Sequence, residues 1–340
     1  RITGGLSIVT VVVCMFFAAV SGSGPATVAA VGTMVIPSML EKGYSKSFSL
    51  ACVACAGCIG VIIPPSIPMV IYGVSTSTSI SAMFLAGFAP GIIIGTVLCL
   101  VCYFYCKKQG WKGDDRKYTF KEKMKVVWDS KFALIEPVII LGGIYSGIFT
   151  ATESAGIAAV YGLIVGLFVY RNIKLKDLWR IFSDAAVSTA VVMFIIANAS
   201  VFAYVLTTNG LPQMLSSAIL SLTDNKILLL LLMNVILLIA GCFLDSGSCM
   251  YIFIPILMPV VKAIGYDPLV FGVVSTVNLA IGMATPPVGL DLYVACNVCG
   301  VTLKSISVQT IRFVAASLIT LILLTYIPQL STFLPTILGM

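Results

Sequence analysis

The sequence contains no histidine and little charge of either sign. Only 10% of its 340 residues are Asp, Glu, Lys or Arg, against roughly 25% in a soluble globular chain. The absence of histidine excludes His-based general base catalysis and His-ligated metal centres. A chain with so few charges cannot cover its surface with polar groups, so its outside must face lipid. The phosphate-binding pattern GxxxxGK[ST] is also absent, so no motif indicates nucleotide binding.

Hydrophobic residues make up 59% of the chain, and the mean hydropathy is +1.10. A spanning helix needs about 20 apolar residues, and several stretches are longer than one crossing and are interrupted by Gly, Pro, Ser or Asp. The apolar stretches are 6–40, 47–74, 83–106, 132–149, 152–170, 185–206, 227–261, 268–296 and 306–327. The sequence therefore predicts an all-α polytopic membrane protein.

The eleven cysteines include three C-x-x-C spacings, at Cys52/Cys55, Cys99/Cys102 and Cys296/Cys299. All three pairs lie in or at the end of apolar helical runs. A spacing of three residues then places both thiols on one helix face, where cysteine packs as a small apolar residue. We expect no cofactor and no metal other than a coupling ion.

Basic residues predict the orientation of the chain. The stretch 107–131 carries nine Lys or Arg against four acidic residues, which indicates a cytoplasmic loop. The stretch 171–180 is also basic and has an apolar face at helical spacing, so we predict an interfacial arm there. With this topology, segment 6–40 starts and ends inside and segment 227–261 starts and ends outside. Each is then a re-entrant hairpin, and the two enter from opposite sides.

An internal repeat relates the two halves of the chain at an offset of 222 residues. Gly43-Tyr44 precedes Pro64-Pro65 by 21 residues, and Gly265-Tyr266 precedes Pro286-Pro287 by the same 21 residues. Three further pairs share the offset: Pro37 with Pro259, Gly60 with Gly282, and Ser23 with Asp245. Each copy therefore contains a hairpin with a polar tip, a Gly-Tyr turn, and a helix broken at Gly-x-x-x-Pro-Pro.

The repeat also predicts what stands before the chain. The second hairpin follows scaffold helices that begin near Lys131, whereas the first hairpin begins near Gly4. By the symmetry of inverted-repeat transporters, we expect scaffold helices of the first repeat to precede Arg1 in the intact protein.

Four interruptions of helical backbone carry the candidate chemistry. Backbone without helical hydrogen bonds is costly in hydrocarbon and persists where it is buried in protein or lines a wet cavity. The two tips are SGSGP at 21–25 and DSGS at 245–248, and the two breaks are GVIIPPS at 60–66 and GMATPPVG at 282–289. The free carbonyls of a broken helix can coordinate a cation, and the N-terminus of its second half can hold a carboxylate. We predict one sodium site per repeat, built from oxygen atoms, with the substrate between them.

Two acidic residues lie near these motifs. Asp245 is a carboxylate expected at mid-membrane depth, which is costly and usually functional; its structural alternative is a helix N-cap. Asp291 follows the second break and can line the same cavity or lie near the interface. For any one of these motifs, the structural alternative is that Pro and Gly only kink a packed helix.

The motifs resemble the large membrane subunit of tripartite ATP-independent periplasmic (TRAP) transporters. The matching stretches are GSGPATVAAVG at 22–32, GVIIPPSIPMVIYGV at 60–74, FLAGFAPG at 84–91, GIYSGIFTATESA at 143–155, LD at 244–245, PILMPVV at 255–261, NLAIGMATPPVGLDLYVA at 278–295 and IPQLSTFLP at 327–335. The resemblance extends from end to end of the chain.

This resemblance implies an inverted-repeat elevator transporter with two re-entrant hairpins and two broken helices, which move as one body and carry an organic acid with sodium ions. It implies three partners: a periplasmic substrate-binding protein, a small membrane subunit, separate or fused, and the lipid bilayer. It implies a multi-pass protein of the bacterial inner membrane. The implied sodium-binding residues are Ser21, Ser23, Gly60, Asp245, Gly282 and Thr285. The implied substrate-binding residues are Ser21, Gly24, Pro65, Ser66 and Pro287.

The expected domain organisation follows the repeat. Residues 1–106 hold the transport elements of the first repeat, and 107–131 form the cytoplasmic loop. The scaffold helices and the arm occupy residues 132–225. The transport elements of the second repeat occupy residues 226–303, and a C-terminal helix occupies residues 304–340.

Three other functions stay open. A stand-alone sodium/dicarboxylate symporter would have similar hairpins but no binding protein. An intramembrane enzyme would need a nucleophile–base pair or paired aspartates, and we find neither. A channel would pass its substrate far faster and without sodium dependence. Because the four motifs contain no Lys or Arg, a second substrate carboxylate has no partner, which favours a sialic-acid-like sugar acid over a C4-dicarboxylate.

Overall fold

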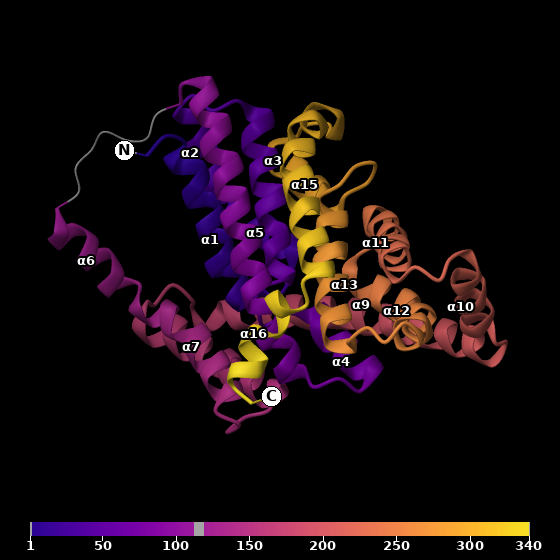
Figure 1. Cartoon of the computed structure of the whole chain (residues 1–340). Coiled ribbons are helices and arrows are strands. Elements are labelled where there is room, and N and C mark those ends of the chain that lie inside the picture. The colour runs from indigo at the N-terminus through magenta and orange to yellow at the C-terminus, as the bar shows by residue number, and fades with distance from the viewer. Residues whose placement is uncertain (1, 112–118, 340) are drawn as a thin grey trace. The chain divides into compact units, whose positions relative to one another are not determined.

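The computed structural model describes residues 2–111 and 119–339, and the regular secondary structure of these residues is entirely helical. The chain divides into two compact units. The large unit comprises Arg1–Asp115 and Ala203–Met340, and the small unit comprises Arg116–Phe202. Figure 1 labels the helices of both units. The five-part organisation predicted from the repeat stays a prediction.

The large unit contains the two repeats as two equivalent sets of helices. The first set is α1 (Gly5–Ser21), α2 (Gly24–Glu41), α3 (Lys46–Gly57) with the 3₁₀ turn η1 (Cys58–Val61), α4 (Ile67–Thr76) and α5 (Ile80–Gln109). The second set is α11 (Lys226–Phe243), α12 (Ser246–Ala263), α13 (Pro268–Met283), α14 (Leu290–Cys299) and α15 (Leu303–Tyr326). When η1 is counted as the end of α3, the offset of 222 residues carries every helix end of the first hairpin and the first broken helix to within one residue of its counterpart.

The turn after each hairpin has the same geometry in both copies. The glycine has a positive φ, 79° at Gly43 and 58° at Gly265, a conformation that glycine adopts without steric cost. The following tyrosine N–H donates to the carbonyl five residues earlier, at 3.1 Å from Tyr44 and 3.0 Å from Tyr266. This is the hydrogen bond of a Schellman helix end, and it fixes where each broken helix begins.

The first halves of the two broken helices form the core of the large unit. Every residue from Phe48 to Gly57 in α3 and from Val270 to Met283 in α13 is buried. A helix that is apolar all round needs neighbours on every side. Those neighbours come from both repeats, because α15 packs against α3 as well as α13, and α5 packs against α13; α3 and α15 run side by side in Figure 1.

The small unit contains α6 (Phe120–Asp129), α7 (Lys131–Tyr145), α8 (Ala151–Ile164) with the π turn η2 (Val165–Val169), and most of α9 (Leu175–Thr208). Tyrosine hydroxyls link its elements: Tyr161 donates to the Phe132 carbonyl at 2.9 Å, and Tyr170 to the Asp129 carbonyl at 2.8 Å. Thr150 and Glu153 start α8 with a capping box.

Several elements differ from the sequence expectation. Residues 175–180 of the predicted interfacial arm form the start of the 34-residue helix α9, and the position of the arm at the membrane interface stays a prediction. The predicted cytoplasmic loop contains α6, a helix of 10 residues, while residues 112–118 of that loop lie outside the described residues. Helix α10 (Leu211–Leu222) was not predicted, and the C-terminal segment divides into α15 and α16 (Gln329–Ile337).

Six of the described helices are long and apolar enough to cross a membrane. They are Ile80–Gln109, Ala151–Val169, Leu175–Thr208, Lys226–Phe243, Ser246–Ala263 and Leu303–Tyr326. The chain is therefore a polytopic all-α membrane protein, as the composition predicted. The entry of the two hairpins from opposite sides stays a prediction.

Candidate functional site

The tip of the first hairpin is held by bonds to one carbonyl oxygen. Ser23 leaves the helical conformation (φ −137°, ψ 129°) and caps α2. Its carbonyl accepts hydrogen bonds from the Ser21 hydroxyl at 3.2 Å, from the Thr27 hydroxyl at 2.8 Å and from the Thr27 N–H at 3.1 Å. The tip is thus an ordered arrangement of hydroxyl and carbonyl oxygens. Thr27 lies inside the GSGPAT motif and was not among the predicted site residues.

The first break lies between η1 and α4, and its Pro64-Pro65 peptide is cis. Ser66 is buried and caps α4 through a bond from the Met69 N–H at 3.4 Å. The Ser66 hydroxyl donates to the Val61 carbonyl at 2.5 Å. This single side chain therefore joins the last residue of the first half-helix to the start of the second.

The first tip packs directly on the first break. The Ile67 N–H donates to the Gly22 carbonyl at 3.3 Å. A Cβ on Gly60 would lie 2.4 Å from the Thr27 hydroxyl oxygen and 2.7 Å from the Ser23 carbonyl oxygen, so only glycine fits there. The structure thus brings together Ser21, Ser23 and Gly60, the predicted sodium residues of the first repeat.

The second tip has a carboxylate where the first has a hydroxyl. Asp245 caps α12, and its side chain accepts bonds from the Ser248 N–H at 2.9 Å and from the Ser248 hydroxyl at 2.5 Å. The side chain is half-buried. The N-cap role weighed for Asp245 is therefore present in this structure, with Ser248 as a partner that the predicted site residues did not include.

The second break lies between α13 and α14, and Pro286-Pro287 is cis, as in the first repeat. The Thr285 N–H donates to the Gly282 carbonyl at 2.8 Å, and the Thr285 hydroxyl donates to the Ile281 carbonyl at 2.6 Å. Gly289 caps α14 without a side chain, at φ 59°. The structure therefore places Gly282 and Thr285 together at the end of α13.

The second hairpin packs on the second break through its first arm. A Cβ on Gly282 would lie 2.7 Å from backbone atoms of Gly241, and the Gly289 N–H donates to the Cys242 carbonyl at 3.0 Å. Gly241 and Cys242 form the last turn of α11, just before Asp245. In the described part of the chain, the Asp245 carboxyl group accepts hydrogen bonds only from Ser248 in α12. Asp245 is therefore connected to Gly282 and Thr285 through the last turn of α11, and not through its own side chain.

Each tip also meets the broken helix of the other repeat. A Cβ on Gly24 would lie 2.9 Å from Oδ2 of Asp291 in α14, and a Cβ on Gly247 would lie 3.2 Å from Ile71 in α4. Accordingly, α14 packs against α2 and α3, and α4 packs against α12. The four interrupted elements form one packed body within the large unit. Of the remaining predicted substrate residues, Pro65 is half-buried beside Gly22, and Pro287 is exposed.

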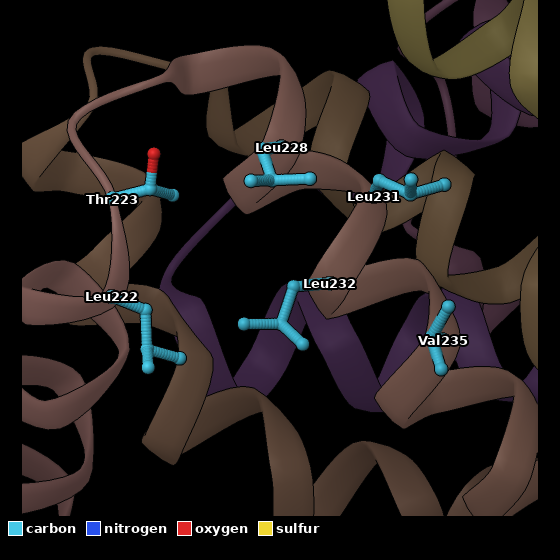
Figure 2. Close-up of a pocket in the computed structure, with 6 residues that line it drawn as sticks. All are labelled: Leu222, Thr223, Leu228, Leu231, Leu232 and Val235. Atoms are coloured by element: carbon cyan, nitrogen blue, oxygen red, sulfur yellow. The ribbon is translucent and has the colours of Figure 1, made fainter.

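A cavity of about 310 Å³ lies elsewhere, against the outer face of α11. Figure 2 shows its lining, which is aliphatic except for one threonine: Leu222, Thr223, Leu228, Leu231, Leu232 and Val235. None of these residues is a predicted site residue. The lining offers one hydroxyl and otherwise only aliphatic groups, so it lacks the set of oxygen atoms that the tips and breaks provide.

The donor atoms at the tips and breaks are carbonyl, hydroxyl and carboxylate oxygens, a set that suits a hard cation. Within residues 2–111 and 119–339 there is no group of three or more His, Cys, Asp or Glu side chains that could hold a metal ion. The assignment of individual residues to sodium or substrate stays a prediction.

Comparison with known proteins identifies the family. Residues 1–330 match the model of the tripartite ATP-independent periplasmic transporter, DctM component. The chain therefore belongs to the DctM family of TRAP transporter large permease subunits, as the motifs predicted.

Three relatives show the range of the family. The chain is 46% identical over 330 residues to the isethionate TRAP transporter permease protein DctMQ of Oleidesulfovibrio alaskensis, covering 97% of this chain and 52% of that protein. It is 42% identical to the C4-dicarboxylate TRAP transporter large permease protein DctM of Pseudomonas aeruginosa, covering 100% of this chain and 79% of that protein. It is 37% identical to the sialic acid TRAP transporter large permease protein SiaM of Vibrio cholerae, covering 98% of this chain and 78% of that protein. The chain thus spans about half of the first relative. Each relative is named a transporter permease, which agrees with the prediction that this chain is not an enzyme.

Proposed function

We propose that the chain carries the substrate-translocating elements of a sodium-coupled secondary transporter that takes up an organic acid across the bacterial inner membrane. The observation that supports this most is the pairing of each tip with a break in both repeats. Ser21, Ser23 and Gly60 meet in the first repeat, and Gly282, Thr285 and the turn before Asp245 meet in the second. Oxygen-lined interruptions of this kind are where transporters bind substrate and coupling ions.

The transport step is an elevator movement in this proposal. The hairpins and broken helices pack against one another across the two repeats, so they can move as one rigid body while the backbone interruptions stay covered. In this proposal, sodium ions bound at the two tips offset the negative charges of Asp245 and of the substrate, and they close the hairpins around the substrate. The names of the relatives support a binding protein and a small membrane subunit as partners, since a DctMQ permease is about twice the matched length.

The substrate in this proposal is an organic acid with one anionic group. The four motifs contain no Lys or Arg, so the anion is held by helix N-termini, chiefly that of α4 at Ser66. The relatives are named for isethionate, C4-dicarboxylates and sialic acid. A sialic-acid-like sugar acid remains our prediction over a C4-dicarboxylate, because serine and threonine hydroxyls suit a polyhydroxylated monocarboxylate.

Uptake into proteoliposomes tests the proposal. The complete transporter is reconstituted with its small subunit, and labelled sialic acid, isethionate or succinate is offered with the cognate binding protein. We expect uptake of one acid only with an inward sodium gradient and a loaded binding protein. Equal uptake when potassium replaces sodium would contradict sodium coupling. Equal uptake without the binding protein would favour the stand-alone symporter.

A further inference from the structure

Asp291 is a buried carboxyl group to which the predicted sites give no role. It lies in the first turn of α14, directly after the second break, and it is 0% exposed. Neither of its side-chain oxygens has a hydrogen-bond partner among the described residues. Buried polar groups in folded proteins are nearly always paired, so this exception needs a physical reason.

The carboxyl group presses against the tip of the first hairpin. A Cβ on Gly24, the first residue of α2, would lie 2.9 Å from Oδ2 and 3.0 Å from Oδ1 of Asp291. Both oxygens therefore face the Gly24 backbone in close contact. A sodium ion with a shell of several oxygen ligands does not fit into this contact, whereas a proton needs no space.

The other neighbours that the described residues provide are thiols and aliphatic side chains. The buried thiols of Cys14 in α1, Cys55 in α3 and Cys58 in η1 lie near the carboxyl group. The helices packed on α14 are α2, α3, α13 and α15, and in the described part of the chain none of them forms an ion pair with Asp291. The packing around α14 is an aliphatic cluster that includes Val28, Leu50, Leu292 and Ala295.

These surroundings favour a neutral side chain. A buried charge without a partner carries a large desolvation cost. The carboxyl group lies in the first turn of α14 and against the first residue of α2, so it is close to the positive ends of both helices, but a helix dipole offsets only a small part of that cost. At the equivalent position of the first repeat, the first turn of α4 has Met69, an apolar and fully buried side chain.

We propose that Asp291 is a proton-binding site, whose carboxyl group holds a proton at the contact between α14 and the first tip in the state that binds the substrate. A proton removes the negative charge directly behind Gly24, a predicted substrate residue. The N-terminus of α2 is then free to attract the anion. This link to the substrate rests on the proposed function, whereas the presence of the proton does not.

Infrared spectroscopy of the complete purified transporter tests for the proton without requiring transport. We expect a C=O stretching band of a protonated carboxyl group that disappears in Asp291→Asn and remains in Asp267→Asn, a matched change at the exposed N-cap of α13. Gly24→Ala should shift the frequency of this band, because the new methyl group contacts the carboxyl group. Identical carboxyl bands in wild type and Asp291→Asn would overturn the proposal. Loss of the band when sodium is added would also overturn it, because Asp291 would then be a sodium ligand.

The pH dependence of thermal unfolding gives a second measurement. A carboxyl group that is protonated in the folded state and ionised in the unfolded state makes unfolding easier as the pH rises. Asp291→Asn lacks this contribution. We expect the melting temperature of Asp291→Asn, relative to wild type, to rise steadily from about pH 6 to about pH 8. A difference that is constant over this range would mean that Asp291 is already ionised, which would overturn the proposal.

Discussion

At the scale of the residue, Ser66 combines a structural and a predicted binding role. Its hydroxyl caps α4 and donates to the Val61 carbonyl across the first break. Its counterpart in the second repeat is Val288, which has no hydroxyl. The difference predicts that the first repeat holds the anionic group of the substrate.

We predict that Ser66→Ala weakens substrate transport more than Val288→Ala does. A lost hydrogen bond to a charged group costs about 1.5–3 kcal/mol, which is about tenfold or more in affinity. Ser45→Ala is the matched control, because Ser45 caps α3 with the same 3.4 Å bond but lies at the other end of the broken helix. The measurement is the substrate concentration for half-maximal uptake. Wild-type affinity and rate in Ser66→Ala would remove Ser66 from the site.

Asp245 gives the second repeat a charge that the first lacks at Ser23. We predict that Asp245→Asn raises the sodium concentration needed for half-maximal transport, because the carboxylate charge attracts the cation. The protein should still fold, since asparagine caps helices as well as aspartate does and can accept one bond from Ser248. Asp267→Asn, at the N-cap of α13, should leave the sodium dependence unchanged. Unchanged sodium dependence in Asp245→Asn would mean that Asp245 is a helix cap only.

At the scale of the element, both repeats depend on a glycine at the break that admits the hairpin. At Gly282 the obstructing atoms belong to the backbone of Gly241, 2.7 Å from a Cβ, so no side-chain rotation can relieve the clash. We predict that Gly282→Ala separates α11 from α13, lowers thermal stability by about 1–3 kcal/mol and weakens sodium-dependent transport.

A matched change separates this effect from a general effect of alanine. Gly156 lies within α8, where a Cβ would meet nothing within 4 Å, so Gly156→Ala should keep both stability and sodium dependence. The measurements are the melting temperature and the sodium dependence of uptake. If Gly282→Ala and Gly156→Ala had the same melting temperature and the same sodium dependence of uptake, the close contact between the hairpin and the break would not be needed.

The repeat explains why the transport elements could be predicted from the sequence. Rare residues such as the paired prolines and the Gly-Tyr turn fix helix ends by local geometry, and these ends agree between copies to within one residue. Helices α6 and α10 have no such counterpart in the visible repeat. The sequence indicates a basic amphipathic stretch at 171–180 and an apolar stretch at 185–206, and the structure joins most of both in one continuous helix, α9.

The site was predictable only where its contacts are local. Ser21, Ser23 and Gly60 could be grouped because a tip and its break follow each other in one repeat. Asp291 could not be placed, because its burial depends on Gly24, which is more than 250 residues earlier in the chain. Ser248 bonds the Asp245 side chain at the third position after that N-cap, so the cap was the signal that could have indicated it. The Thr27 hydroxyl donates to the carbonyl four residues earlier, a bond that threonine can make within a helix.

At the scale of the whole molecule, the proposed function depends on the two repeats being inverted in the membrane. Helices α2 and α12 end at equivalent residues, Glu41 and Ala263, and both residues are exposed. If the second hairpin enters from the opposite side, these two helix ends face opposite compartments. Alternating access by two inverted repeats requires this arrangement.

We predict that Glu41→Cys reacts with a membrane-impermeant thiol reagent only from the cytoplasmic side, and Ala263→Cys only from the periplasmic side. The native thiols interfere little, since nine of the eleven cysteines are buried and Cys99 and Cys299 can be replaced by alanine in the background. The reagent is applied to right-side-out and inside-out vesicles of the complete transporter, and labelling is measured on the purified chain. Because both positions are the last residue of equivalent helices, local structure cannot account for a difference between them. Labelling of both cysteines from the same side would mean that the repeats are parallel, and the proposed elevator movement would have to be abandoned.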